Sequence, residues 1–413
     1  MSLNSLSQIS EDEHLLMNSF DALVQSLGLE LLIEARTTDA GRGLFSIAEI
    51  PPHTVLFQIP ASQLVNCRTL APHYPAGLDA IQLISLHLGR YRRTPQPDPL
   101  FGPYISTLPR EFSHPLTTHV HQTDSTFPPS VATALARLHT RYLRDWNAVR
   151  GYLKANSLTK LADEVLEADF LWGWLNVNTR CVYHRLKGAR SHPDNFTMCP
   201  ILDLANHTVA GPTMIPRVSD AERNNAPPIA KLGDPLTLLS PATPTKPGEE
   251  LYLTYGAHSN KTLFVEYGFV VPCAPDDPRA EVDVQDIVEP MFENQGNDGA
   301  AKMKILQDSG YWGDWTLDAS PSVSYRLTTA LRLLHVPLGD SGALERWQGT
   351  LTGLRDTVSD ANESASKRTV ADICAILIQR AKARMPETNS SMVRVLWEEE
   401  MHVAMRVSSM LGA

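Results

Sequence analysis

The chain has 413 residues, of which 43% are hydrophobic and 20% are charged, and its formal net charge is −10. This balance excludes a largely disordered protein and predicts two or three globular domains of mixed α and β structure. The charge also argues against a nucleic-acid binder, because phosphate contacts come from clustered Lys and Arg side chains.

The five cysteines are scattered and never form a Cys-x-x-Cys pair, so neither a disulfide framework nor a thiolate zinc site is expected. The N-terminal segment has no basic stretch followed by an apolar core, and no apolar run approaches the roughly 20 residues that span a bilayer. We therefore expect a cytoplasmic or nuclear protein with no metal, no membrane contact and no nucleic-acid partner.

The first part of the chain predicts one helix and then a small sheet. A capping box of Ser10 and Glu13 predicts a helix that ends at Gly28. The hydrophobic period then shortens to two, which indicates strands. The expected strands are 31–35, 44–48 and 55–59, with a tight turn at 39–43.

From Asp79 the apolar spacing becomes helical, and a longer apolar stripe begins at Val131 with Ser130 as its expected N-cap. The Pro-rich stretch 95–129 is expected to be mostly loop, and 170–180 is expected to be helical. Strand character returns at 198–202, 236–239 and 251–254, around a polar surface loop at 218–235.

The remainder of the chain shows helical periodicity at 300–308, 323–334, 344–360, 369–385 and 391–410. This order of elements is typical of a β domain interrupted by a helical insert and followed by a separate α domain. The expected parts are an N-terminal helix (1–29), a first β part (30–75), a helical insert (76–180), a second β part (181–275) and a helical domain (276–413).

Four short motifs are candidates for chemistry. Gly41-Arg42-Gly43 falls in the expected turn, where glycine lets backbone approach a ligand closely. The run from Asp203 to His207 follows an expected strand, and its Asn-His pair can bind a polar ligand. Tyr255-Gly256 and Tyr267-Gly268-Phe269 place aromatic side chains near strand ends. Taken singly, each motif is more often an ordinary turn or part of the core.

The order and spacing of the four motifs resemble those of the SET-domain methyltransferases. More narrowly, they are similar to the split-SET group typified by the Rubisco large-subunit lysine methyltransferase. Further matching segments are Phe101-Gly102-Pro103-Tyr104 with Leu108-Pro109, Trp172 to Arg180, and Ser259-Asn260 ahead of Glu266. The resemblance runs from about Glu34 to Val270 and continues more faintly through the helical tail.

The resemblance implies an α+β fold, in which a helical insert interrupts the SET-domain β-fold and a helical C-terminal domain binds the protein substrate. It implies S-adenosyl-L-methionine as cofactor and Tyr255 as the catalytic residue. The residues that it assigns to the cofactor are Gly41, Arg42, Gly43, Arg180, Asp203, Asn206, His207, Tyr255 and Tyr267. The residues that it assigns to the substrate are Asn178, Thr179, Tyr267 and Phe269. The sequence departs from the type member at Asn178, which leaves the role of that residue open.

The implied reaction is the in-line attack of a neutral amine on a sulfonium methyl group. Only about one free lysine in two thousand is neutral at pH 7, so an apolar channel beside a positive charge would favour the reactive form. Tyr255 would orient the amine and the methyl group, and positioning would supply most of the catalysis without a metal. A histidine or N-terminal amine acceptor remains an alternative, as does a non-catalytic SET scaffold that only binds a partner. We expect a monomer that acts on a protein presenting a lysine.

Overall fold

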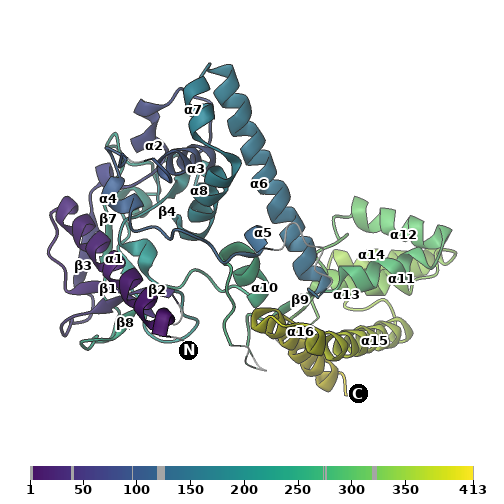
Figure 1. Cartoon of the computed structure of the whole chain (residues 1–413). Coiled ribbons are helices and arrows are strands. Elements are labelled where there is room, and N and C mark those ends of the chain that lie inside the picture. The colour runs from purple at the N-terminus through teal and green to yellow at the C-terminus, as the bar shows by residue number, and fades with distance from the viewer. Residues whose placement is uncertain are drawn as a thin grey trace. The chain divides into compact units, whose positions relative to one another are not determined.

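The computed structural model describes residues 3–38, 41–94, 96–118, 126–272, 274, 277–318 and 323–412. The chain divides into two compact units, one formed by 1–112 with 140–257 and the other by 113–139 with 258–413. Small sheets and helices alternate in the first unit, and helices dominate the second (Figure 1). The α+β class predicted from the sequence is therefore confirmed.

Two three-stranded sheets form the main β structure of the first unit. One has the order β1–β2–β8 and the other β3–β7–β6, and all neighbouring strands are antiparallel. The strands are β1 (Ile33–Thr38), β2 (Gly41–Ser46), β3 (Val55–Ile59), β6 (Ile215–Pro216), β7 (Leu236–Leu239) and β8 (Glu250–Leu251). Each sheet pairs strands from before the helical insert with strands from after it.

The N-terminal helix is longer than the capping motif predicts. Helix α1 (Leu3–Leu27) contains both Ser10 and Glu13, so the predicted capping box is wrong. No glycine or proline precedes Ser10 to stop the helix from extending upstream. Gly28 ends α1 as predicted, with a φ of 63° that favours glycine.

The Gly41-Arg42-Gly43 motif lies in a strand and not in the turn that the sequence predicts. Thr38 pairs with Gly41 and Arg36 pairs with Gly43, so β1 and β2 are joined through 39–40, which lie outside the described residues. Two-residue links are the commonest hairpin connections, because the twist of the turns they form matches the twist of the paired strands. The predicted five-residue turn is therefore wrong, and the glycines belong to β2.

The helical insert is built around α3 and α8, which lie side by side (Figure 1). Gly173 of α8 faces the Ser85 carbonyl so closely that a Cβ there would clash, and Gly89 of α3 likewise faces the backbone of Asp169. These glycines let the two helices approach at backbone distance. The helices are α2 (Cys67–Leu70), α3 (Ala80–Tyr91), α4 (Gly102–Ile105), α6 (Pro129–Ala155), α7 (Thr159–Glu164) and α8 (Glu167–Arg180).

Ser130 does not cap α6, which begins one residue earlier, at Pro129. Proline suits the first position of a helix, because the N–H that it lacks would have no partner there. The Ser130 hydroxyl instead donates to Glu400 Oε1 at 3.1 Å. The Pro-rich stretch predicted as loop also contains two short helices, α4 and α5 (Pro115–Thr118).

Two strands predicted after the insert are shorter than expected or displaced. In the segment predicted as strand 198–202, Met198 makes a single bridge to Val65, and the chain then enters the 3₁₀ helix Leu202–Leu204. Strand β8 stops at Leu251 and continues only as isolated bridges. The remaining short elements of the unit are β4 (Val182–Tyr183), β5 (Phe196–Thr197) and, within the predicted loop, α9 (Asp220–Arg223).

Helices α15 and α16 lie side by side in the second unit (Figure 1), whose core includes the fully buried Phe292, Trp315 and Trp347. The elements of this unit, besides α5 and the part of α6 up to residue 139, are α10 (Asn260–Thr262), the π-helical turn η5 (Leu263–Tyr267), β9 (Glu281–Asp283), α11 (Gln285–Glu293), α12 (Asn297–Asp308), β10 (Thr316–Asp318), α13 (Tyr325–Leu334), α14 (Ser341–Leu351), α15 (Asp360–Arg384) and α16 (Ser391–Met410). None of the helices in the described ranges is long and apolar enough to cross a membrane.

The single helix predicted over 344–360 is wrong. Helix α14 ends at Leu351, and Gly353 then takes a φ of 73°, which breaks the helix. Helix α15 begins at Asp360, where Ser359 caps it by accepting from the Asn362 N–H. The helix predicted over 391–410 matches α16. Helix α11 and the short β9–β10 pair were not predicted.

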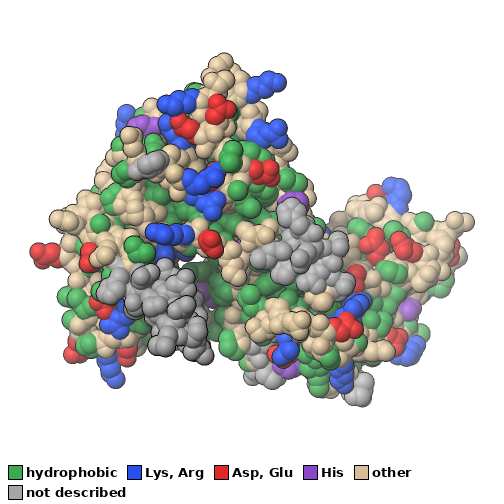
Figure 2. Space-filling view, in the orientation of Figure 1, with side chains coloured by type: hydrophobic (Ala, Val, Ile, Leu, Met, Phe, Trp, Pro, Cys, Tyr) green, Lys and Arg blue, Asp and Glu red, His purple; other side chains and the backbone are tan. Residues whose placement is uncertain are grey.

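Charged side chains of both signs are interspersed on the face shown in Figure 2. Ion pairs between exposed side chains contribute little to stability. The first unit therefore depends on its apolar core, in which Leu44, Phe170 and Trp174 are almost completely buried.

Candidate active site

The segment after β8 pairs with the Asn206-His207 segment. The Leu253 N–H donates to the Asn206 carbonyl at 2.8 Å, and the Thr208 N–H donates to the Leu253 carbonyl at 2.9 Å. Leu253 therefore forms a parallel bridge with His207. This pairing brings Tyr255, which follows Leu253 closely in the chain, against the predicted cofactor motif.

Tyr255 contacts the residues on both sides of Asn206. Its hydroxyl donates to the Ala205 carbonyl at 2.8 Å, and its backbone N–H donates to Nδ1 of His207 at 3.1 Å. The ring centroids of Tyr255 and His207 lie 5.1 Å apart, with an angle of 31° between the ring planes. Residues that are far apart in the sequence are thus in direct contact.

Asn206 directs its amide nitrogen at Glu250 of β8. Nδ2 of Asn206 donates to Glu250 Oε1 at 2.7 Å, and the Tyr252 hydroxyl donates to Oε2 at 2.6 Å. The second hydrogen bond raises the pKa of Tyr252 to about 12. Gly43 of β2 lies beside this pair, and a Cβ at Gly43 would overlap Glu250 Oε1 and lie 3.1 Å from Asn206 Nδ2. The glycine in the strand therefore makes room for the Asn206–Glu250 pair.

The other two residues of the glycine motif have different surroundings. Arg42 Nη1 donates to the Thr107 carbonyl at 2.6 Å, which links β2 to the helical insert. Gly41 has a φ of 109°, and no group lies within 4 Å of the position that its Cβ would take. Of the three residues, Gly43 is the one that the structure brings to Asn206.

Arg180 and Asp203 meet in a network with Tyr104. Arg180 Nη1 donates to the Asp203 carbonyl at 2.6 Å and lies 3.6 Å from Oδ2, to which the Tyr104 hydroxyl donates at 2.9 Å. The Asp203 side chain is 2% exposed, and burial raises its pKa even though Arg180 favours the charged form. The network holds the 3₁₀ turn Leu202–Leu204, which leads directly into Asn206.

Asn178 and Thr179 lie in the last turn of α8 and make hydrogen bonds within the insert. Arg141 donates to Asn178 Oδ1 at 2.7 Å, and the Thr179 hydroxyl donates to the Leu175 carbonyl at 2.8 Å. The Thr179 bond is the back-bond that threonine commonly makes inside helices. The substrate role of both residues stays a prediction.

Tyr267 and Phe269 belong to the second unit, at the end of the π-helical turn η5. Their ring centroids lie 6.2 Å apart, and that of Tyr267 lies 6.1 Å from the ring of His258. Gly268 between them has a φ of 84°, and a Cβ there would lie 3.0 Å from the Ser113 carbonyl. The backbone of this turn is thus fixed by a glycine, and π-helical turns are frequent at functional sites. The roles assigned to Tyr267 and Phe269 stay predictions.

Known proteins are similar to this chain over most of its length. The chain is 29% identical over 302 residues to ribosomal lysine N-methyltransferase set11 of Schizosaccharomyces pombe. The aligned region covers 72% of this chain and 68% of that protein. It is 27% identical over 371 residues to SET domain-containing protein 4 of Mus musculus. Here the aligned region covers 85% of this chain and 78% of that protein. No family model matches the chain.

Solved structures share the fold of the chain. The SET domain of LSMT bound to lysine and AdoHcy matches with a TM-score of 0.69 at 19% identity, over 96% of this chain and 91% of that one. Rubisco LSMT bound to sinefungin and monomethyllysine matches over the same shares, with a TM-score of 0.67 at 17% identity. The chain is thus similar over most of its length to proteins named as lysine methyltransferase or SET-domain protein, and it has the fold of the LSMT SET domain. The predicted SET-domain fold is therefore confirmed, and the names of the two relatives agree with the predicted family.

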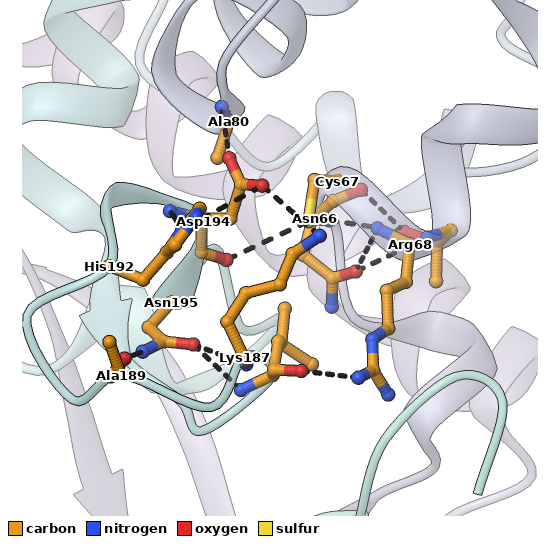
Figure 3. Close-up of polar contacts among 11 residues, drawn as sticks. Asn66, Cys67, Arg68, Ala80, Lys187, Ala189, His192, Asp194 and Asn195 are labelled. Carbon is orange, nitrogen blue, oxygen red and sulfur yellow. Dashed lines mark hydrogen bonds and ion pairs between the residues drawn. The ribbon is translucent and has the colours of Figure 1, made fainter. Parts of the chain in front are cut away.

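A second polar cluster of the first unit surrounds Asp194 (Figure 3). Its Oδ1 accepts from the Ala80 N–H at 3.1 Å, and its Oδ2 lies 3.3 Å from Lys187 Nζ. The Asp194 carbonyl accepts from Cys67 Sγ at 3.7 Å, and burial raises the pKa of the Cys67 thiol. A thiol with a raised pKa is a poor nucleophile, so a catalytic role for Cys67 is not indicated. The hydrogen bonds of the cluster instead anchor the loop that carries Asp194 to α2 and α3. In the part of the chain that the structure describes, no group of three or more His, Cys, Asp and Glu side chains could hold a metal ion.

Sequence reasoning did not assign a role to Glu250 or to Tyr252. Both residues stand shortly before the Tyr255-Gly256 motif, where Glu249 precedes Glu250 and looks equivalent to it. The signal that distinguishes them is alternation, because residues two apart on an extended strand point to the same face. Glu250 shares that face with Tyr252, and the tertiary structure then places Asn206 there.

Proposed function

We propose that this protein is an S-adenosyl-L-methionine-dependent methyltransferase that transfers a methyl group to the ε-amine of a lysine in a protein substrate. The observation that carries the proposal is the contact of Tyr255 with the Ala205 carbonyl and with His207, on either side of Asn206. The relative named ribosomal lysine N-methyltransferase set11 supports the same activity, as do the LSMT structures bound to lysine and AdoHcy.

The surroundings of Asn206 fit a cofactor that carries a charged amino-acid end. Asn206 uses Nδ2 toward Glu250, and none of the described residues donates to its Oδ1, which is therefore an available acceptor for an ammonium group. Asp203 Oδ1 and Arg180 Nε are buried with no hydrogen-bond partner among the described residues. Buried polar atoms without partners call for a ligand or a water, and these two supply an acceptor and a donor. The residues proposed to hold the cofactor are Gly41, Arg42, Gly43, Arg180, Asp203, Asn206, His207, Tyr255 and Tyr267.

Tyr255 has the geometry to orient an incoming amine. S-adenosyl-L-methionine, when bound, supplies the methyl group on a positively charged sulfur. Because the Tyr255 hydroxyl donates its proton to the Ala205 carbonyl, its oxygen lone pairs face away from that bond and can accept an amine N–H. The hydroxyl and carbonyl oxygens lie 2.8 Å apart, and two fixed oxygens of this kind favour a methyl group that carries partial positive charge. Alignment of the reacting groups then supplies most of the rate enhancement.

The side chains that we propose to line the lysine path are Asn178, Thr179, Tyr267 and Phe269. Aromatic, partly desolvated surroundings lower the pKa of a lysine amine, which increases the neutral fraction that can attack. We further propose that the helical domain 276–413 binds the protein substrate. A ribosomal protein is the proposed substrate class, because the set11 relative is named for ribosomal lysine methylation. We also propose that the protein is a monomer and that it is located in the cytoplasm or nucleus.

The test uses cells that lack this protein as the source of unmethylated substrate. Ribosomes and total lysate from these cells are incubated with tritiated S-adenosyl-L-methionine and either the wild-type chain or Tyr255→Phe. We expect a labelled band with the wild-type chain, at least a hundredfold less label with Tyr255→Phe, and methyl-lysine by mass spectrometry. Equal labelling by the two proteins would remove Tyr255 from the mechanism. Label on histidine or on an N-terminal amine would change the acceptor and leave the methyltransferase activity in place.

A further inference from the structure

We propose that Glu250 is a positioning residue that decides which end of the Asn206 amide faces the cofactor. This inference rests on the proposed function, because it assigns Asn206 to the cofactor. Glu250 is itself directed at Asn206 and Tyr252 and makes no direct contact with the reacting atoms in this role.

The chemistry of the pair allows one orientation of the amide. An ionised carboxylate only accepts hydrogen bonds, whereas an asparagine amide has a donor end and an acceptor end. With Glu250 Oε1 2.7 Å from Asn206 Nδ2, a flipped amide would place two oxygen atoms at hydrogen-bond distance and repel. Glu250 therefore keeps Nδ2 on its own side and leaves Oδ1 on the opposite side. That oxygen accepts no hydrogen bond from the described residues, and it is the end that an ammonium group requires.

Two neighbours fix the carboxylate in turn. The Tyr252 hydroxyl donates to Oε2 at 2.6 Å, so each carboxylate oxygen has its own donor. Glu250 pairs with Phe45 in the ladder between β2 and β8, and this pairing places the Glu250 side chain beside Gly43. A Cβ at Gly43 would overlap Oε1, so the strand glycine is needed for the carboxylate to reach Asn206. The glycine motif thus acts on the cofactor site through Glu250 as well as through its own backbone.

The orienting role can be separated from a simple effect of negative charge. In Glu250→Gln, the amide oxygen can accept from Asn206 Nδ2 while the amide nitrogen donates to the Tyr252 hydroxyl oxygen, so the orientation is kept and the charge is lost. In Glu250→Ala, both the acceptor and the charge are lost, and the Asn206 amide is free to turn. The matched control is Glu249→Ala, because the exposed Glu249 carboxylate accepts only from the nearby Lys246 N–H at 2.8 Å among the described residues.

The experiment measures the affinity for S-adenosyl-L-methionine by calorimetric titration of the full chain, with folding checked by circular dichroism and thermal melting. We expect Glu250→Ala to weaken binding by about tenfold or more, as expected for loss of a charge-assisted hydrogen bond. Glu250→Gln should stay within about threefold of the wild-type affinity, and Glu249→Ala should bind as the wild-type chain does. In methylation assays, Glu250→Ala should raise the KM for the cofactor more than it lowers kcat.

A double-mutant cycle decides whether Glu250 acts through Asn206. If it does, adding Glu250→Ala to Asn206→Ala should weaken binding by less than about twofold beyond Asn206→Ala alone. Fully additive losses would overturn the proposal, as would wild-type affinity in Glu250→Ala. An equal loss in Glu250→Gln and Glu250→Ala would assign the effect to charge and also overturn it. A wild-type chain that fails to bind the cofactor would instead remove the proposed function, and this role with it.

Discussion

Glu400 of α16 should make the stability of the second unit depend on pH. Its side chain is 5% exposed, Oε1 accepts from Ser130, and Oε2 is buried with no hydrogen-bond partner among the described residues. Burial raises the pKa of Glu400 from an ordinary 4.5 to about 8, although Arg380 and Lys261 favour the charged form and Asp286 opposes it. At a pH between these two values, the folded protein therefore keeps a proton on Glu400 that the unfolded chain has released.

The sign and size of the effect follow from proton linkage. A carboxyl whose folded pKa is raised contributes its full stability below pH 4.5, and this is lost as pH rises toward 8. One pKa unit corresponds to about 1.4 kcal/mol, so the difference between the two pKa values of Glu400 sets an upper bound of about 5 kcal/mol on the stability that is lost. Relaxation and water penetration on ionisation lower the expected loss to about 2–3 kcal/mol. The adjacent Glu399, whose pKa burial raises to about 7 beside Asn260, Asp277 and Arg279, titrates in the same window.

The assay compares thermal melts of the wild-type chain and Glu400→Gln from pH 5 to pH 9. Glutamine resembles the protonated acid, so the two proteins should melt together near pH 5. At pH 9 the variant should melt higher by roughly 4–12 °C, taking about 2–4 °C per kcal/mol for a domain of this size. Glu398→Gln is the matched control, because Glu398 lies two residues before Glu400 in α16 and is only partly buried. Parallel melting profiles for wild type and Glu400→Gln at every pH would refute the reasoning.

Three further outcomes are expected. Asn206→Ala should weaken cofactor binding by about 1–3 kcal/mol in calorimetric titration, from a lost buried hydrogen bond, and unchanged affinity would count against the site. Gly173→Ala should lower the melting temperature because its Cβ would clash with the Ser85 carbonyl, whereas Gly151→Ala in α6, with nothing within 4 Å of its Cβ position, should stabilise by about 0.5–1 kcal/mol. Arg68→Ala removes the donors to the Leu186 and Ala230 carbonyls, so amide hydrogen exchange should speed up at 184–195, and unchanged protection there would contradict this anchoring role.

Long periodic segments were predictable from the sequence because their pattern is local. The apolar stripe of α16 predicts both of its ends, and the strand 236–239 matches β7. The errors lie where a local signal has two physical meanings. A Ser-x-x-Glu pattern occurs inside α1 as readily as at a helix start, and Ser130 sits behind a proline that begins α6 first. The helix predicted over 344–360 failed because apolar spacing continued across Gly353, which ends regular structure by its backbone conformation.

By itself, the sequence determined the order of the motifs and their resemblance to the SET-domain methyltransferases, because the types and spacing of residues are a property of the chain alone. The three-dimensional arrangement decided which atoms meet. Gly43 entered a strand beside Glu250, Asn206 received a fixed amide orientation, and the Tyr255 hydroxyl came to the Ala205 carbonyl. Each of these contacts joins segments that are distant in the chain. The contact of Gly43 with Glu250 depends on the register of strands β2 and β8, and the contacts of Asn206 and Tyr255 depend on the pairing of Leu253 with His207. Register is set by non-local hydrogen bonds and burial, and a local pattern does not encode it.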